Sequence, residues 1–253
     1  MAETHVNRGE AHIRKGKLGG SNKEFSEDLR FDPDVSLIYI NRGKAYLEQE
    51  QYERAIRDFN EAIRLDHRNV IAYNIRGETF LKQAKCDEAI GDFSEAIGIN
   101  PNAPLTFVSR GKAYMEQGKY EEAIRDFDEA IRLDPDVPIA YDKRGEAYMK
   151  QGHYDTALLD FTEAVGLTSG VSDTYVSRGK AHLEQEQYGE AIKAFSEAIW
   201  FAPQDPIAYV SRGLAYGQLG QREQAIQDLE KALSLAPDNG EQIRQDLRKL
   251  RGE

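Results

Sequence analysis

The dipeptide Arg-Gly recurs along the chain at a constant spacing of 34 residues. Each glycine stands in the same frame, with an aromatic residue or His four positions before it, another three after it, and Phe or Leu sixteen after it. Because a fixed period of this length indicates one supersecondary unit used repeatedly, we expect an array of similar units. The seven glycines are Gly9, Gly43, Gly77, Gly111, Gly145, Gly179 and Gly213.

Within one unit, the apolar spacing predicts two helices of about 14 residues, joined by a short turn. A glycine inside a helix costs about 0.5–1 kcal/mol relative to alanine. We therefore expect Gly111 to allow close contact with the second helix, where Ala123 and Ala130 are the small residues. All 8 prolines fall in the closing loop or at the first residue of the next unit, where a first helical turn tolerates them.

This frame resembles the tetratricopeptide repeat. The resemblance implies an all-α fold, an α-solenoid of antiparallel helix pairs in a right-handed superhelix, with first helices lining a concave groove and second helices on the convex side. It also implies a non-catalytic protein–protein interaction scaffold. We expect seven units, followed by a capping helix over 240–253 with an apolar stripe of Ile243, Leu247 and Leu250. The units are 2–35, 36–69, 70–103, 104–137, 138–171, 172–205 and 206–239.

An arginine precedes every repeat glycine, where the family most often has leucine. Since a partly buried arginine favours a carboxylate, we expect each to pair with the acid fifteen residues after the glycine. The alternative is that the arginines reach a ligand. Repeat six has Ala194 at the position of the acid. The expected pairs are Arg8–Glu24, Arg42–Asp58, Arg76–Asp92, Arg110–Asp126, Arg144–Asp160 and Arg212–Asp228, with Arg178 left over.

The first helices carry more apolar residues than solubility needs, three positions before and four after the glycine. Two interpretations stay open: these side chains pack between adjacent helices, or they form a partly apolar groove that receives a peptide or helix. Under the second interpretation the groove residues are Ile40, Asn41, Lys44, Leu47, Asn74, Glu78, Leu81, Val108, Lys112, Met115, Asp142, Glu146, Met149, Val176, Lys180 and Leu183.

Opposite charges stand directly after each of the first six glycines and four residues further on, where they share one helix face. They predict i,i+4 ion pairs whose sign order reverses from one repeat to the next, which leaves the groove neutral. Such a groove is not typical of a site for a strongly acidic or basic tail. The pairs are Glu10/Arg14, Lys44/Glu48, Glu78/Lys82, Lys112/Glu116, Glu146/Lys150 and Lys180/Glu184.

The formal net charge of −11 argues against a nucleic-acid partner, which needs a basic face. Cys86 is the only cysteine, so a disulfide framework is excluded and a reducing compartment is favoured. The sequence shows neither a leader nor an apolar run long enough to span a membrane, so we expect a cytoplasmic protein. We find no catalytic or phosphate-binding motif and no metal-ligand spacing, and expect no cofactor.

Self-association is the alternative function. In repeat one, Ser21 and Asp28 replace the alanines of the frame, which is typical of a terminal capping repeat or of a helix that exchanges with a partner. Trp200 is an aromatic residue that the frame does not require, and with Phe201 beside it, it marks either a contact patch for a homo-oligomer or packing on the neighbouring repeat.

Overall fold

The structure is a computed structural model that describes residues 18–32, 35–168, 172–237 and 240–252. Fourteen helices and no strand occur in these residues. The first helix expected for repeat one, with Arg8, Gly9, Glu10 and Arg14, lies outside the described residues. The helices are α2 (Leu18–Phe31), α3 (Ser36–Leu47), α4 (Tyr52–Leu65), α5 (Val70–Lys82), α6 (Cys86–Ile99), α7 (Pro104–Glu116), α8 (Tyr120–Leu133), α9 (Pro138–Lys150), α10 (Tyr154–Leu167), α11 (Ser172–Glu184), α12 (Tyr188–Phe201), α13 (Pro206–Gln218), α14 (Arg222–Leu235) and α15 (Glu241–Arg251).

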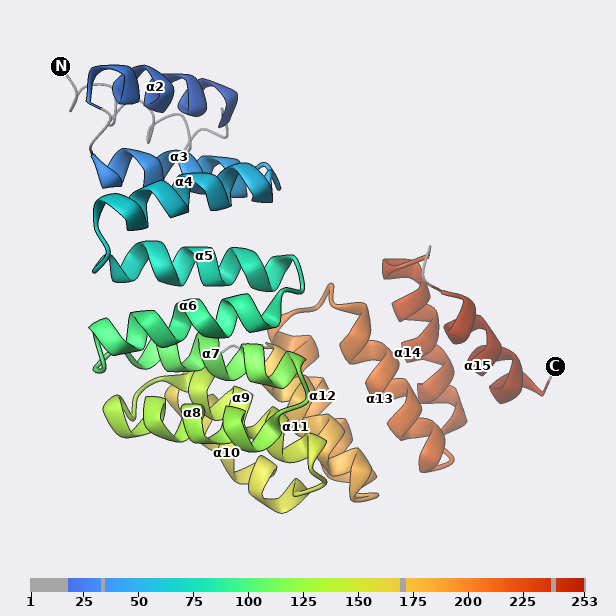
Figure 1. The fold of residues 1–253 in the computed structure, drawn as a ribbon. Helices are drawn as coiled ribbons and strands as arrows, with labels where there is room; N and C mark the ends of the chain where they lie inside the picture. Colours follow the sequence, from blue (N-terminus) through green and yellow to red (C-terminus); the bar gives the residue numbers. More distant parts are fainter. Residues whose placement is uncertain (1–17, 33–34, 169–171, 238–239, 253) are drawn as a thin grey trace. The chain divides into compact units, whose positions relative to one another are not determined.

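The helices fall into two compact units, residues 1–129 and 130–253, with the division inside α8. In the first unit α3 pairs with α4 and α5 with α6, and these four helices are stacked side by side (Figure 1). In the second unit the pairs are α9 with α10, α11 with α12 and α13 with α14. The all-α class and the pairing of consecutive helices confirm the prediction from the repeat.

The repeat glycines lie where the two helices of a pair touch. A Cβ atom on Gly77 would come within 2.8 Å of the ring of Phe93, and one on Gly111 within 2.5 Å of the ring of Phe127. Real Cβ atoms do not approach other atoms so closely, so only glycine fits. The expected close contact is confirmed, and the side chain against each of these glycines is the phenylalanine sixteen residues later, on the second helix.

The turn between paired helices uses the left-handed backbone region at one frame position. Gly118 and Gly152 have φ values of 71° and 76° there, which glycine adopts without strain. Ala84 occupies the same position in repeat three with φ 57°, where a Cβ atom is unfavourable. The turn geometry therefore persists in repeats that lack the glycine.

An arginine ladder joins the helices of each pair and confirms five of the expected pairs. In each, Nε and Nη2 of the arginine donate to the two carboxylate oxygens at 2.6–2.8 Å: Arg42–Asp58, Arg76–Asp92, Arg110–Asp126, Arg144–Asp160 and Arg212–Asp228. Hydrogen bonding to Asp126 raises the pKa of Arg110 above its ordinary value. A fork of this geometry fixes both helices at once.

The ladder also connects one repeat to the previous one. Nη1 of Arg110 donates to Ser94 Oγ at 3.0 Å, and Nη1 of Arg42 donates to Ser26 Oγ at 3.1 Å. Arg178, which faces Ala194 in place of an acid, pairs with Glu197 one turn further along α12. The arginines thus hold helices together, as the structural interpretation predicts.

Helix α2 packs as a second helix of the repeat despite its altered frame. Phe25 is fully buried against Ile38 and Ala45 of α3. Ser21 and Asp28, which replace alanines, are also fully buried. At the other end of the chain, Ile243 and Leu247 of α15 are buried in a cluster with Leu229 and Ala232 of α14. Both α2 and α15 are therefore packed against the neighbouring described helix.

Candidate binding groove

The sequence-predicted groove residues divide by burial into two sets. Most predicted groove side chains three positions before the glycine are buried, and Asn41, beside Ile40, is buried with them. This favours packing between helices over direct ligand contact for Ile40, Val108 and Val176. Side chains one and four positions after the glycine keep accessible surface: Lys44, Leu47, Glu78, Leu81, Lys112, Met115, Glu146, Met149, Lys180 and Leu183 are exposed or half-buried.

Two polar residues interrupt the buried row. Asn74 is half-buried and donates from Nδ2 to Thr106 Oγ1 at 3.1 Å, a bond between α5 and α7. Asp142 is buried, and its Oδ2 lies 3.2 Å from Nζ of Lys143. Neither Asn74 Oδ1 nor Asp142 Oδ1 has a hydrogen-bond partner among the described residues. Each leaves an acceptor that a donor could satisfy.

The expected i,i+4 ion pairs are not formed in the described helices. Lys44 and Glu48, for example, are both exposed and make no ion pair. Glu146 pairs with Lys143 at 2.6 Å rather than with Lys150. Burial lowers the pKa of Lys143, but Glu146 and Asp142 raise it, and the net shift is upward. Lys143 therefore stays a cation, and it is a groove charge that the repeat frame did not single out.

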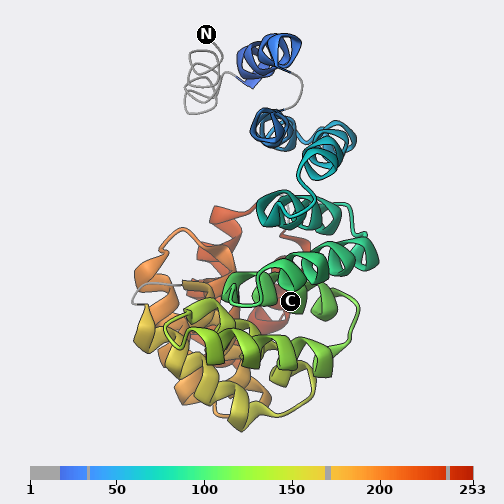
Figure 2. The same cartoon turned by 60° about the vertical axis from the view of Figure 1, so that its left-hand side comes forward.

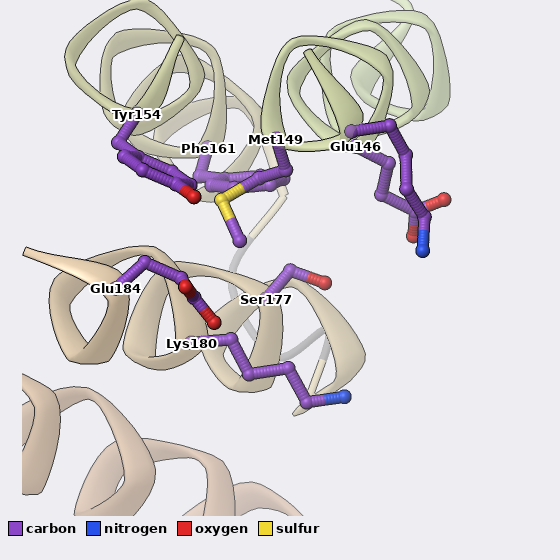
Figure 3. A pocket seen from close by; sticks show the side chains of 8 residues that line it. Glu146, Met149, Tyr154, Phe161, Ser177, Lys180 and Glu184 are labelled. Atoms are coloured by element: carbon purple, nitrogen blue, oxygen red, sulfur yellow. The ribbon is translucent and has the colours of Figure 1, made fainter. Parts of the chain in front are cut away.

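A cavity of about 490 Å³ lies in the second unit between α9, α10 and α11 (Figure 3). Met149, Tyr154 and Phe161 form its apolar part, and Ser177, Lys180 and Glu184 project from α11 opposite. Glu146 and Lys150 complete the lining. The cavity thus combines an apolar surface with a rim of two acids and two bases.

The cavity brings together three predicted groove residues, Glu146, Met149 and Lys180. Five further residues line the cavity and were not among the groove residues predicted from the sequence: Lys150, Tyr154, Phe161, Ser177 and Glu184. Lys150 and Glu184 were visible as members of the charge pattern. Tyr154 and Phe161 belong to α10, and only the packing of α10 against α9 shows that second helices contribute to the cavity.

Trp200 and Phe201 end α12 with very different surroundings. The ring of Phe201 stacks on Tyr175 of α11 with 5.2 Å between centroids. Trp200 meets the edge of Phe201 at 4.6 Å but remains 76% exposed. Trp200 therefore does not pack into the neighbouring repeat and offers an aromatic surface to solvent.

Other chemistry is sparse in the part of the chain that the structure describes. No group of three or more His, Cys, Asp or Glu side chains could hold a metal ion there. Burial, with help from Glu116, raises the pKa of the Cys86 thiol, which disfavours the thiolate a nucleophile needs. Among the described helices, none is long and apolar enough to cross a membrane.

Comparison with known proteins gives one consistent result. Family models described as TPR repeat match residues 43–84 and 111–152, and models described as tetratricopeptide repeat match 139–170 and 179–251. No curated protein sequence matches the chain.

Solved structures match over most of the chain. A tetratricopeptide repeat protein from Parabacteroides merdae has a TM-score of 0.77 at 19% identity and covers 100% of this chain and 99% of its own. MamA has a TM-score of 0.58 at 28% identity, with 63% of this chain and 93% of its own covered. YrrB, described as a TPR protein with an unusual peptide-binding site, has a TM-score of 0.58 at 21% identity, with 76% and 97% covered.

Proposed function

Because the chain belongs to the tetratricopeptide repeat family, we propose that it is a non-catalytic scaffold that binds a peptide or helix of a partner protein along its first helices. Proteins of this family are protein–protein interaction scaffolds in general. The observation that carries the proposal is the cavity of about 490 Å³ between α9, α10 and α11, in which three predicted groove residues meet.

The lining of this cavity suits a side chain of a partner polypeptide. Met149 and Tyr154, both half-buried, supply polarizable and aromatic surface, which adapts to aliphatic and aromatic groups alike. The rim carries Glu146 and Lys150 on α9 against Lys180 and Glu184 on α11, so its formal charges sum to zero. An apolar anchor with neutral or mixed-charge flanks therefore fits better than a strongly charged tail.

Site-specific photo-crosslinking tests the groove directly. With p-benzoylphenylalanine in place of Met149, we expect covalent adducts with a discrete partner protein in lysate of the source cells. Leu159 of α10 is the matched control, since it is apolar and 70% exposed but does not line the cavity. Identical adducts from positions 149 and 159, or none from 149, would contradict binding in the groove.

Self-association is a second candidate, favoured by Trp200, which is 76% exposed at the end of α12. Exposed tryptophan is enriched in binding hot spots, where truncation costs about 2 kcal/mol or more. On this model the chain forms a homo-oligomer at micromolar concentration, and Trp200→Ser shifts it to the monomer. Light scattering measures the molar mass at several protein concentrations. If the wild-type protein is a monomer at all of them, self-association is excluded as its function.

A further inference from the structure

A second cavity, of about 430 Å³, lies in the first unit on a different face of α3 from the groove side chains. Figure 2 shows α3 and α4 nearly end-on, side by side. Since an α-helix turns about 100° per residue, Tyr39, Arg42 and Tyr46 share a face that Lys44 and Leu47 do not. We call this cavity the arginine pocket; its lining is Tyr39, Arg42, Tyr46, Arg54, Arg57, Asp58, Asn60 and Glu61.

Both acids of the arginine pocket are already paired. Asp58 takes the two hydrogen bonds from Arg42 at 2.8 and 2.7 Å, and Glu61 accepts from Arg64 at 2.8 Å. Neither carboxylate compensates the remaining two arginines of the lining.

Arg54 and Arg57 keep their charges uncompensated. Nη1 of Arg54 donates to the neutral side chain of Gln51 at 2.8 Å, and its guanidinium lies over the ring of Tyr46 at 5.7 Å. Arg57 makes no ion pair or hydrogen bond with any described residue. The two cations stand three residues apart, on neighbouring turns of one helix face. This concentration of positive charge occurs in a chain with a net charge of −11.

The other described repeats do not carry two basic residues at the frame positions of Arg54 and Arg57. Repeat four has Glu122 and Arg125 at the two positions, and repeat six has Glu190 and Lys193. In both, the acid pairs with the base, at 3.7 and 2.7 Å. The remaining pairs at these positions are Gly20 with Lys23, Glu88 with Gly91, Thr156 with Leu159 and Gln224 with Gln227. Only the second repeat, among those described, carries two bases there.

We propose that the arginine pocket is a second binding site that takes an acidic peptide segment, with side-chain carboxylates bound by Arg54 and Arg57. The planar guanidinium fork matches a carboxylate through two parallel hydrogen bonds. The rings of Tyr39 and Tyr46 give the methylene groups of a glutamate an apolar surface to lie on. A nucleic acid fits less well, because the negative charge of the whole chain opposes a long polyanion.

Fluorescence anisotropy with a fluorescein-labelled hexaglutamate peptide at about 50 mM salt tests the site, since screening is weak there. We expect wild-type protein to bind the peptide and the double variant Arg54→Gln, Arg57→Gln to bind at least about tenfold more weakly. Arg125→Gln, at the frame position of Arg57 in repeat four, is the matched control and should bind within about twofold of wild type.

Three binding results would overturn the proposal, and so would the oligomer described below: wild-type protein that does not bind hexaglutamate, a double variant that binds like wild type, or an Arg125→Gln variant weakened as much as the double variant. Circular dichroism melts check folding, and because both arginines are exposed we expect no loss of stability. If the wild type is an oligomer that the double variant dissociates, a second copy fills the pocket and the acidic-peptide proposal fails. Met149→Ser, in the groove, should leave hexaglutamate binding unchanged, which separates this site from the proposed function.

Discussion

At the scale of single residues, the glycines inside helices fall into two kinds. Gly77 faces Phe93, and a Cβ atom there would lie 2.8 Å from the ring. Gly91, in the middle of α6, is exposed, and a Cβ atom there would meet nothing within 4 Å. The first glycine is required by packing, whereas the second only lowers helix propensity.

Gly91→Ala should therefore raise the free energy of unfolding by about 1 kcal/mol, the difference in helix propensity between the two residues. Urea denaturation followed by circular dichroism measures it. Gly77→Ala is the opposing control and should lower the free energy of unfolding by about 1–3 kcal/mol through overpacking. Equal effects of the two substitutions would refute the distinction.

The sequence predicted only part of the contacts that these glycines and the neighbouring apolar side chains make. The recurrence of glycine predicted a close approach of helices, but it did not say which group on the second helix makes the contact, and the structure shows that Phe93 does so. The sequence left open whether Ile40 and Val108 face a neighbour or a ligand. Their burial follows from how adjacent helices are rotated, which depends on packing across repeats.

At the scale of helices, the arginine ladder is the connection with the largest expected contribution. Arg110 and Asp126 are largely buried and form two hydrogen bonds. Arg178 is equally buried, but its partner Glu197 is 51% exposed. The two arginines occupy the same frame position and differ in the environment of their partner.

Arg110→Gln should lower the free energy of unfolding by about 3 kcal/mol, because it leaves the buried carboxylate of Asp126 uncompensated. Arg178→Gln, with a solvated partner, should cost about 0–1 kcal/mol. Thermal and urea unfolding of both variants measures the contrast. A loss at Arg178 as large as that at Arg110 would show that the arginine stems, rather than the forks, stabilise the helix pairs.

Prediction from sequence worked less well for exposed charges than for buried ones. The ladder pairs were predictable because a buried arginine needs a carboxylate partner, and the repeat period fixes the position of that acid in the sequence. The pairs Lys44/Glu48 and Glu146/Lys150 were not formed, because flexible exposed side chains gain little from pairing in water. Lys143, which is partly buried and three residues from Glu146, takes that carboxylate instead.

At the scale of the whole chain, the period predicted the helical class and the succession of helix pairs, because one unit repeats with little variation. It could not predict the cavity between α9, α10 and α11, which needs side chains from three helices. The period did not predict the arginine pocket either, because that pocket arises from two basic residues that only the second repeat carries among those described. A periodic sequence determines its common features well, and its individual sites poorly.

The C-terminal helix offers a test of how stability is distributed. In an array where each unit contacts only its neighbours, a lost end contact should destabilise the adjacent helices first. Leu247→Ser removes a buried side chain of α15 from the cluster with Leu229 and Ala232. We expect faster hydrogen exchange in α13 and α14, with α9 and α10 unchanged, as measured by mass spectrometry. Arg248→Ser, exposed on the same helix, is the control, and uniform loss of protection along the second unit would contradict the model.

The hydrogen bonds from Arg42 and Arg110 to a serine sixteen residues earlier, together with the fork to an acid sixteen residues later, have a consequence for chain length. The rungs at Arg42, Arg110 and Arg212 each bond to the repeat before them and to their own repeat, at the same two sequence spacings. A copy of 34 residues can therefore be inserted or removed between rungs while each cation keeps a complete set of acceptors. The protein is built so that it can be lengthened or shortened in whole units, and in no smaller step.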